Sequence, residues 1–306
     1  PAHRALLRGV GRQAARPEVA AMTPSPFIVG TGRCGTTLLR LMLDAHPEVA
    51  VPPETHFIPA ALRACRRSLR PRRAFLKAVT GAPFWRDHHL EERELRRRVE
   101  ALTPFGAGEA LRAFYRLYAE GRGKTRWGDK TPFYVLHMRD IQDALPEARF
   151  IHLIRDGRDV ALSFRGLWFG PDSVSEAAER WVSWIEAARR QAPALAGYLE
   201  VRYEDLVVRT EATLKTVCDF IGLRWDAAML DYHLSAGERL GEMVQPLRAR
   251  EGRVIGPEER RAIHERAGQP PRADRVGLWR TEMHPSDQAR FERVAGRLLR
   301  ELGYDA

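Results

Sequence analysis

The sequence predicts a single α/β domain: a P-loop-like parallel β-sheet with helices on both faces, a helical insertion and a lid. Three observations lead to this fold class. Short apolar runs typical of buried parallel strands alternate along the chain with amphipathic segments of helical period. The first apolar run leads directly into a glycine-rich turn and a helix. No repeat, low-complexity tract or long Ser/Gly linker divides the 306 residues into separate units.

The apolar runs predict a sheet of five strands, and right-handed crossovers place their carboxyl ends along one ligand-binding edge. The expected strands are Phe27–Val29, Val49–Val51, Thr125–Trp127, Phe150–Ile154 and Leu199–Tyr203. The expected helices between and after them are Thr36–Ala45, Tyr134–Ala144, Asp159–Trp168, Ser175–Ala192 and Glu211–Ile221.

The chain outside these elements divides into three segments. Residues 1–24 are expected to be an N-terminal arm, with disordered chain as one interpretation, and residues 25–306 to form the domain. The helical, arginine-rich segment Ala60–Gly123 is predicted to be an insertion beside the ligand edge. The segment Gly237–Pro271, dense in Gly, Pro and charge, is predicted to be a mobile lid. Selectivity for the acceptor substrate is expected to depend on these last two segments.

The turn after the first strand predicts a phosphate-binding loop. Gly30, Gly32 and Gly35 let the backbone curl so that its N–H groups converge on an anion. Thr36 and Thr37 then begin a helix whose positive end faces the same point. The sequence therefore predicts that phosphate binds between the first strand and the first helix.

The loop departs from that of nucleoside triphosphatases at its cation. Gly30 and Gly35 match the G-x-x-x-x-G frame, but Thr36 stands where that frame has lysine. The cation is Arg33 instead, whose guanidinium can fork onto an oxyanion at the mouth of the loop. Cys34 is interpreted as a small filler, because no acyl or redox partner stands beside it in the sequence.

A second anion site is predicted at the end of the strand Phe150–Ile154. Arg155 follows this strand directly and is aimed at the same edge as the loop. Ser163 lies eight residues on, about two helical turns away, so its hydroxyl is expected beside Arg155. The competing interpretation is a solvated turn with helix-starting ion pairs. Two anion sites are therefore expected at one edge of the sheet.

In their order and spacing, these and further segments resemble sulfotransferases that use 3′-phosphoadenosine 5′-phosphosulfate (PAPS), closest to the tyrosylprotein-sulfotransferase-like branch. The segments are Ser25–Val49, Val51–Pro59 (VPPETHFIP), Trp127–Tyr134 (WGDKTPFY), Ala148–Phe164, Val201–Val207 (VRYEDLV) and, weakly, Leu302–Ala306. The resemblance implies transfer of a sulfuryl group from PAPS to an acceptor hydroxyl, with 3′,5′-ADP as product and no metal.

The resemblance also implies which residues bind the donor. Those of the loop are Gly32, Arg33, Cys34, Gly35, Thr36 and Thr37. Arg155 and Ser163 are expected to hold the 3′-phosphate and Tyr203 to contact the nucleotide. Arg275, Trp279 and Arg280 are similar to a loop that closes over the nucleotide.

For catalysis, the resemblance implies that Glu54 is the general base that removes the acceptor proton. His56 remains the alternative base, or a substrate contact, because residues two apart in an extended segment face the same side. It stands where the family pattern has arginine. Lys130 and Arg33 are expected to stabilise the charge that develops on the bridging oxygen.

Composition bounds the function. The net charge of +10 comes almost wholly from arginine and favours an anionic cosubstrate. Nucleic acid is not an expected partner, because the basic residues of helices such as Glu91–Val99 are interleaved with Glu. Three scattered cysteines suit a reducing compartment and no zinc site, and no apolar run reaches the length of a membrane span. We therefore expect a cytoplasmic, bacterial protein without a membrane partner.

Two questions stay open at this point. The acceptor is a small-molecule or protein hydroxyl of unknown identity, and the oligomeric state is undetermined. The alternative function is a P-loop nucleoside-phosphate kinase or triphosphatase, for which Asp129 and Asp156 are the nearest magnesium ligands.

Overall fold

The computed structural model describes residues 22–249 and 252–304, so most of the predicted N-terminal arm, residues 1–21, lies outside the described residues. Its centre is a four-stranded sheet of order β4-β1-β5-β6 in which every pair is parallel. The strands are β1 (Ser25–Gly30), β4 (Asp129–Lys130), β5 (Ala148–Ile154) and β6 (Tyr198–Arg202). The predicted α/β class with a parallel sheet is confirmed.

Two predicted strands lie outside this sheet. β2 (Val49–Ala50) and β3 (Arg126–Trp127) pair with each other in a separate parallel ribbon. At Gly128 the chain passes so close to β1 that a Cβ atom would lie 2.7 Å from Pro26. The chain then enters the main sheet as β4, beside β1. The sequence prediction therefore placed the edge strand a few residues too early.

Fourteen α-helices are present in the described part of the chain. Those around the sheet are α1 (Thr36–Asp44), α6 (Met138–Ala144), α7 (Gly157–Phe164), α8 (Val174–Gln191), α9 (Tyr203–Val208), α10 (Thr210–Phe220), α13 (Trp279–Glu282) and α14 (Pro285–Glu301). The insertion contributes α2 (Ile58–Arg67), α3 (Pro71–Thr80), α4 (Glu92–Glu100) and α5 (Ala107–Glu120). The lid segment contains α11 (Ala236–Gly241), α12 (Pro257–Ala262) and an antiparallel hairpin of β7 (Leu247–Arg248) and β8 (Val254–Ile255).

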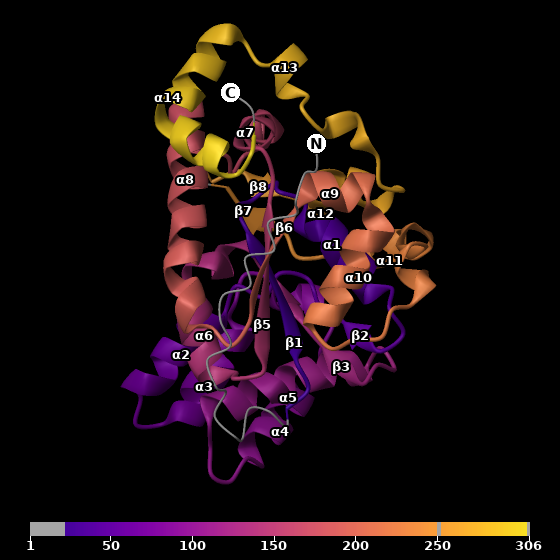
Figure 1. Cartoon of the computed structure of the whole chain (residues 1–306). Coiled ribbons are helices and arrows are strands. Elements are labelled where there is room, and N and C mark those ends of the chain that lie inside the picture. The colour runs from indigo at the N-terminus through magenta and orange to yellow at the C-terminus, as the bar shows by residue number, and fades with distance from the viewer. Residues whose placement is uncertain (1–21, 250–251, 305–306) are drawn as a thin grey trace.

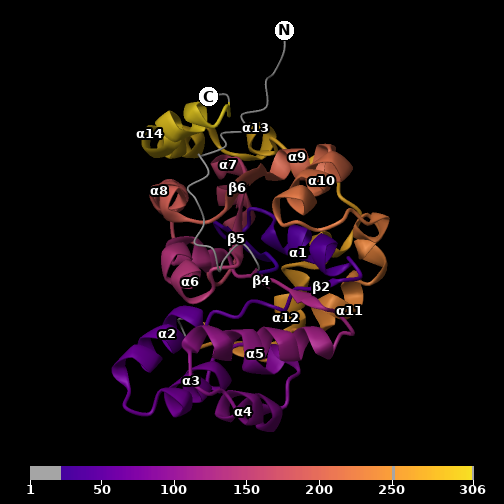
Figure 2. The same cartoon turned by 60° about the horizontal axis from the view of Figure 1, so that its bottom comes forward.

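Helices cover both faces of the sheet. In Figures 1 and 2, α8 lies on one side of β5 and β1, whereas α1 and α10 lie on the other. Figure 2 shows α2 to α5 as a separate helical layer beside the sheet. No helix in the described ranges combines the length and apolar character that crossing a membrane requires.

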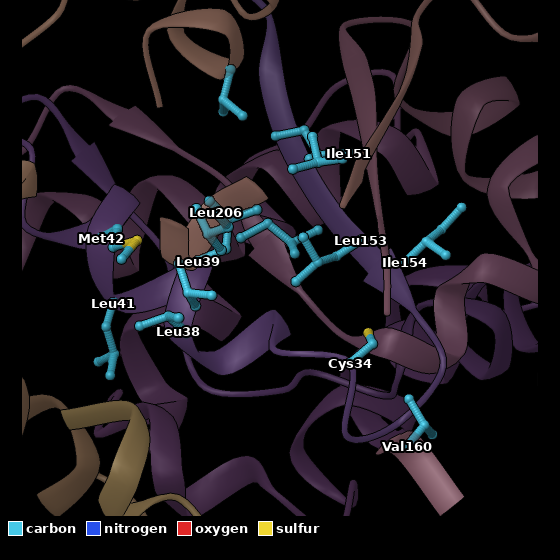
Figure 3. Close-up of a cluster of buried hydrophobic side chains, with 14 of the residues drawn as sticks. Cys34, Leu38, Leu39, Leu41, Met42, Ile151, Leu153, Ile154, Val160 and Leu206 are labelled. Carbon is cyan, nitrogen blue, oxygen red and sulfur yellow. The ribbon is translucent and has the colours of Figure 1, made fainter. Parts of the chain in front are cut away.

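Successive side chains along the strands point to opposite faces of the sheet and are buried in two separate apolar cores. Ile28 and Leu153 are buried with Leu39 of α1 in one cluster, and Figure 3 shows Leu39 and Leu153 between the helix and the strand. Phe27 and Phe150 point to the opposite face and pack with the insertion helices in the second cluster. Burial of both faces explains why the strands are nearly continuous apolar runs.

Three predicted elements have wrong boundaries. The expected helix Tyr134–Ala144 is a 3₁₀ turn, Pro132–Leu136, followed by α6. The helix α7 begins before Asp159 because the Asp156 carboxylate accepts the Arg158 N–H at 2.9 Å as an N-cap, and it ends at Phe164. Tyr203 begins α9 instead of ending a strand.

Candidate active site

The predicted phosphate loop lies between β1 and α1, at the carboxyl ends of the strands. Gly35 caps α1 with a φ of 100°, and a Cβ atom there would lie 2.5 Å from the ring of Tyr203. A Cβ atom on Gly30 would lie 2.5 Å from the carbonyl oxygen of Leu153. Both positions therefore require glycine for steric reasons. A Cβ on Gly32 would lie 3.0 Å from the ring of Phe164.

Arg33 and Ser163 are in direct contact. Nε of Arg33 donates to Oγ of Ser163 at 3.1 Å, although the sequence predicted that Ser163 lies beside Arg155. The guanidinium of Arg155 is held elsewhere: Nη2 donates to the carbonyl of Arg275 at 2.7 Å, and the group lies 4.6 Å from the ring of Tyr203. The loop, the end of β5 and α7 therefore converge as predicted, but Arg33 is the hydrogen-bond partner of Ser163.

Positive charge accumulates at this convergence. Burial and the neighbouring charges of Arg155 and Arg275 lower the pKa of Arg33. Nε of Arg155 is buried without a hydrogen-bond partner among the described residues. Guanidinium groups that repel one another and leave a donor unused favour binding of a ligand with several negative charges.

The segment that carries Glu54 is fixed to the WGDKTPFY motif. The N–H of Thr55 donates to Oγ1 of Thr131 at 3.0 Å, and its hydroxyl donates to Oδ2 of Asp129 at 2.8 Å. The hydroxyl of Tyr134 accepts from the N–H of Ile58 at 3.0 Å. These buried bonds hold the segment beside the end of β4.

Glu54 has a partner on each oxygen. Nζ of Lys130 lies 2.6 Å from Oε1, and Nε2 of His56 lies 2.7 Å from Oε2. His56 has a φ of 52°, so the segment is not regularly extended, yet its side chain still reaches Glu54. Burial by itself would raise the pKa of Glu54, but Lys130 and His56 outweigh it and hold the pKa well below the usual value. Glu54 is therefore a carboxylate.

Lys130 connects this carboxylate to the phosphate loop. Its Nζ also donates to Oγ1 of Thr37, the second residue of α1, at 3.3 Å. The candidate base, the candidate cation and the loop thus form one chain of contacts.

The segment predicted to close over the nucleotide lies against α7. Asp159 accepts the N–H groups of Gly277 and Trp279, each at 2.9 Å. The guanidinium carbon of Arg158 lies 3.5 Å from the centroid of the Trp279 ring, and the guanidinium carbon of Arg280 lies 4.6 Å from it. The structure therefore brings this segment to the Arg155 region through its backbone, while Arg280 is exposed on Trp279.

Cys34 fills space inside the loop. Its side chain is fully buried, and burial raises the pKa of the thiol to about 12. A neutral, enclosed thiol agrees with the interpretation as a filler.

Two features of the site escaped the sequence analysis. Asp159, four residues after Arg155, lies 3.7 Å from the Arg155 guanidinium, and this i,i+4 spacing was a usable signal. His264, in the lid segment, places Nδ1 3.3 Å from Oγ1 of Thr37, and no local pattern marks it. Among the described residues, no group of three or more His, Cys, Asp or Glu side chains is arranged to hold a metal ion.

The sheet, the loop and the cations at one edge define an α/β protein with an anion site of the kind that suits a phosphorylated ligand. A family model described as the sulfotransferase family matches residues 24–227, and the chain belongs to this family. The match disfavours the kinase or triphosphatase alternative.

Relatives agree with this assignment. Protein-tyrosine sulfotransferase 1 of Danio rerio is 27% identical over 92% of this chain and 72% of its own length. Protein-tyrosine sulfotransferase A of Caenorhabditis elegans is 28% identical over 71% of this chain and 54% of its own length. Nodulation protein NoeE of Sinorhizobium fredii is 29% identical over 91% of this chain and 65% of its own length. The chain thus spans about half to three quarters of these relatives.

A solved structure shares the fold. The sulfotransferase domain of the olefin synthase from Synechococcus PCC 7002 superposes with a TM-score of 0.61 at 23% identity, covering 92% of this chain and 95% of that domain.

Proposed function

We propose that this protein transfers a sulfuryl group from PAPS to the hydroxyl of an acceptor. One observation carries the proposal: Arg33, Arg155 and Ser163 come from the loop, the end of β5 and α7, and lie within one network of contacts. A donor with phosphate at the 3′ and 5′ positions of its ribose needs two anion sites along one edge of the sheet. The family membership of the chain supports the same assignment.

The residues fit such a donor. The start of α1 and the loop N–H groups suit the 5′ end; Arg33 belongs to this loop, and Lys130 contacts Thr37 at the start of α1. Arg155 and Ser163 suit the 3′-phosphate, and Tyr203 packs against Arg155. When bound, PAPS supplies the sulfuryl group.

In the proposed reaction, Glu54 removes the proton from the acceptor hydroxyl while the acceptor oxygen forms the new bond to sulfur. The bond from sulfur to the bridging oxygen breaks, and its electron pair stays on the 5′-phosphate. Lys130 and Arg33 stabilise this charge. In the ligand-free protein Lys130 neutralises Glu54. Movement of the Lys130 ammonium toward the bridging oxygen would raise the pKa of Glu54 and so make it a stronger base.

The acceptor side of the site faces the insertion. The ring of Phe84 stacks on His56 with a centroid distance of 4.7 Å, next to Glu54. Several relatives are protein-tyrosine sulfotransferases, so we include a protein tyrosine among the proposed acceptors, beside small-molecule hydroxyls.

Isothermal titration calorimetry without magnesium tests the proposal. We expect 3′,5′-ADP to bind much more tightly than 5′-AMP or ATP, because only 3′,5′-ADP occupies both anion sites. Equal affinity for 5′-AMP would remove the second phosphate site, and a requirement for magnesium would favour nucleoside-phosphate chemistry.

A further inference from the structure

Part of the lid segment lies directly on the phosphate loop. The carbonyl oxygen of Ile263 accepts from Nη2 of Arg33 at 3.2 Å. The next residue, His264, places Nδ1 3.3 Å from the hydroxyl of Thr37. These contacts lie at the mouth of the loop, where the proposed function places the 5′ end of the donor.

The position of His264 is held by a buried anchor. Arg260, on α12 and one helical turn earlier, donates to Oδ2 of Asp87 at 2.6 Å, and both side chains are buried. Asp87 also accepts the N–H groups of Val244 and Gln245. The insertion therefore fixes α12, and α12 delivers His264 to the loop.

Cations dominate the surroundings of His264. The charged groups that face it are Arg33 from the loop, Arg40 from α1, Lys130 from β4 and Glu54 from the segment before α2. Burial is the largest cause that lowers the pKa of His264, to about 3, and Lys130 is the next. The imidazole is therefore neutral in the ligand-free protein.

We propose that His264 is a further donor-site residue, which takes up a proton when the 5′-phosphate end of the donor or product binds. This inference rests on the proposed function. A phosphate group at Thr37 brings negative charge within reach of the ring, and an opposite charge favours the protonated form. The proton comes from solvent, and the imidazolium then donates a charge-assisted hydrogen bond to a phosphate oxygen.

The imidazolium of His264 would thereby neutralise part of the ligand charge, whereas in the ligand-free protein the same ring is uncharged. The affinity of the site for 3′,5′-ADP would rise as the pH falls through the pKa of the ligand-bound imidazole toward that of the ligand-free imidazole. Release of 3′,5′-ADP would correspondingly be favoured as the pH rises.

Proton uptake can be measured directly. The wild-type protein, His264→Gln and the control His284→Asn are titrated with 3′,5′-ADP at one pH in two buffers of different ionisation enthalpy. His284→Asn removes an exposed imidazole at the start of α14 and keeps a side chain able to cap that helix. The dependence of the binding enthalpy on the buffer gives the number of protons taken up, and the contribution of the ligand is the same for all three proteins.

We expect the wild-type protein and His284→Asn to take up roughly half a proton more than His264→Gln near pH 6.5, the ordinary pKa of histidine. Equal uptake by His264→Gln and the wild-type protein would overturn the inference and leave the proposed function standing. Failure of the wild-type protein to bind 3′,5′-ADP would overturn both.

A second readout does not depend on the folding of the variant. The affinity of the wild-type protein for 3′,5′-ADP is measured from about pH 8 to about pH 5.5 and compared with the loss of affinity that protonation of the ligand phosphates alone would cause, which titration of the free ligand gives. The measured affinity is expected to rise above that curve as the pH falls through about 6.5. An affinity that follows the curve of the ligand would also overturn the inference.

Discussion

Nζ of Lys130 lies 2.6 Å from Oε1 of Glu54, so the candidate base and the candidate electrophilic cation neutralise each other in the ligand-free protein. The Lys130 side chain is buried, which strengthens the pair by excluding water. In the proposed reaction the donor competes with Glu54 for Lys130, and that competition would couple donor binding to activation of the base.

Glu54→Gln is expected to retain affinity for 3′,5′-ADP while turnover falls about a hundredfold or more, because a general base contributes on this order. Calorimetry and single-turnover assays with PAPS measure the two quantities. His56→Gln is the comparison variant and is expected to have the smaller effect. Retained turnover in Glu54→Gln would transfer the role of base to His56.

Arg155→Gln should weaken 3′,5′-ADP binding about tenfold to a hundredfold, the value of a charge-assisted contact to phosphate. The affinity for 5′-AMP, which lacks the 3′-phosphate, should hardly change. Arg96→Gln serves as the control, because Arg96 is an exposed arginine on α4, in the helical insertion. A parallel loss of both affinities in Arg155→Gln would show that Arg155 supports the whole site and not the 3′ end.

Gly35→Ala is expected to lower the free energy of unfolding by about 1–3 kcal/mol, because the φ of 100° is strained for alanine and the new Cβ meets Tyr203. Urea unfolding measures the change. The control Gly237→Ala lies in α11, where a Cβ atom has open space, and should be neutral or slightly stabilising. Equal stability of the two variants would contradict the steric argument.

Asp87→Ala should destabilise the protein by about 3–5 kcal/mol, since it leaves the buried positive charge of Arg260 without its carboxylate partner. The exposed pair of Glu92 and Arg96 on α4 supplies the control, and Glu92→Ala should cost less than about 0.5 kcal/mol. Thermal and urea unfolding distinguish the two. A small effect of Asp87→Ala would show that the lid segment does not depend on this anchor.

Asp129 is expected to make stability depend on pH. Burial raises its pKa from 3.8 to about 6, so the folded protein binds this proton more tightly than the unfolded chain. Its contribution to stability is therefore complete below pH 3.8 and is lost as the pH rises through about 6. Asp129→Asn should flatten the pH dependence of unfolding in this window by on the order of 1–3 kcal/mol. An unchanged slope would refute the assignment.

Much of the site was predictable because it is encoded by neighbouring residues. A strand, a glycine turn and a helix start occupy consecutive positions from Ser25 to Asp44, and backbone sterics determine that they form a tight loop of the shape that suits phosphate. Arg155 could be placed because it follows β5 directly, and strand ends share one edge in a parallel sheet.

Short strands were harder to place. The residues of Thr125–Trp127 are typical of a strand in the main sheet. Gly128, however, passes close to β1, and it is the following residues, Asp129 and Lys130, that pair with β1. Which of two adjacent short segments pairs with β1 depends on tertiary packing, and the local pattern of apolar residues carries no information about that packing.

The sequence by itself determined the α/β class, the phosphate loop and the arginine that replaces a loop lysine, because these depend on backbone geometry over a few consecutive residues. Only the tertiary structure decided that Ser163 contacts Arg33, that Lys130 pairs with Glu54, and that His264 reaches Thr37. Each of these pairs joins residues far apart in the chain. Which long side chains meet depends on the packing of several elements at once, and that packing has no signature in any single segment.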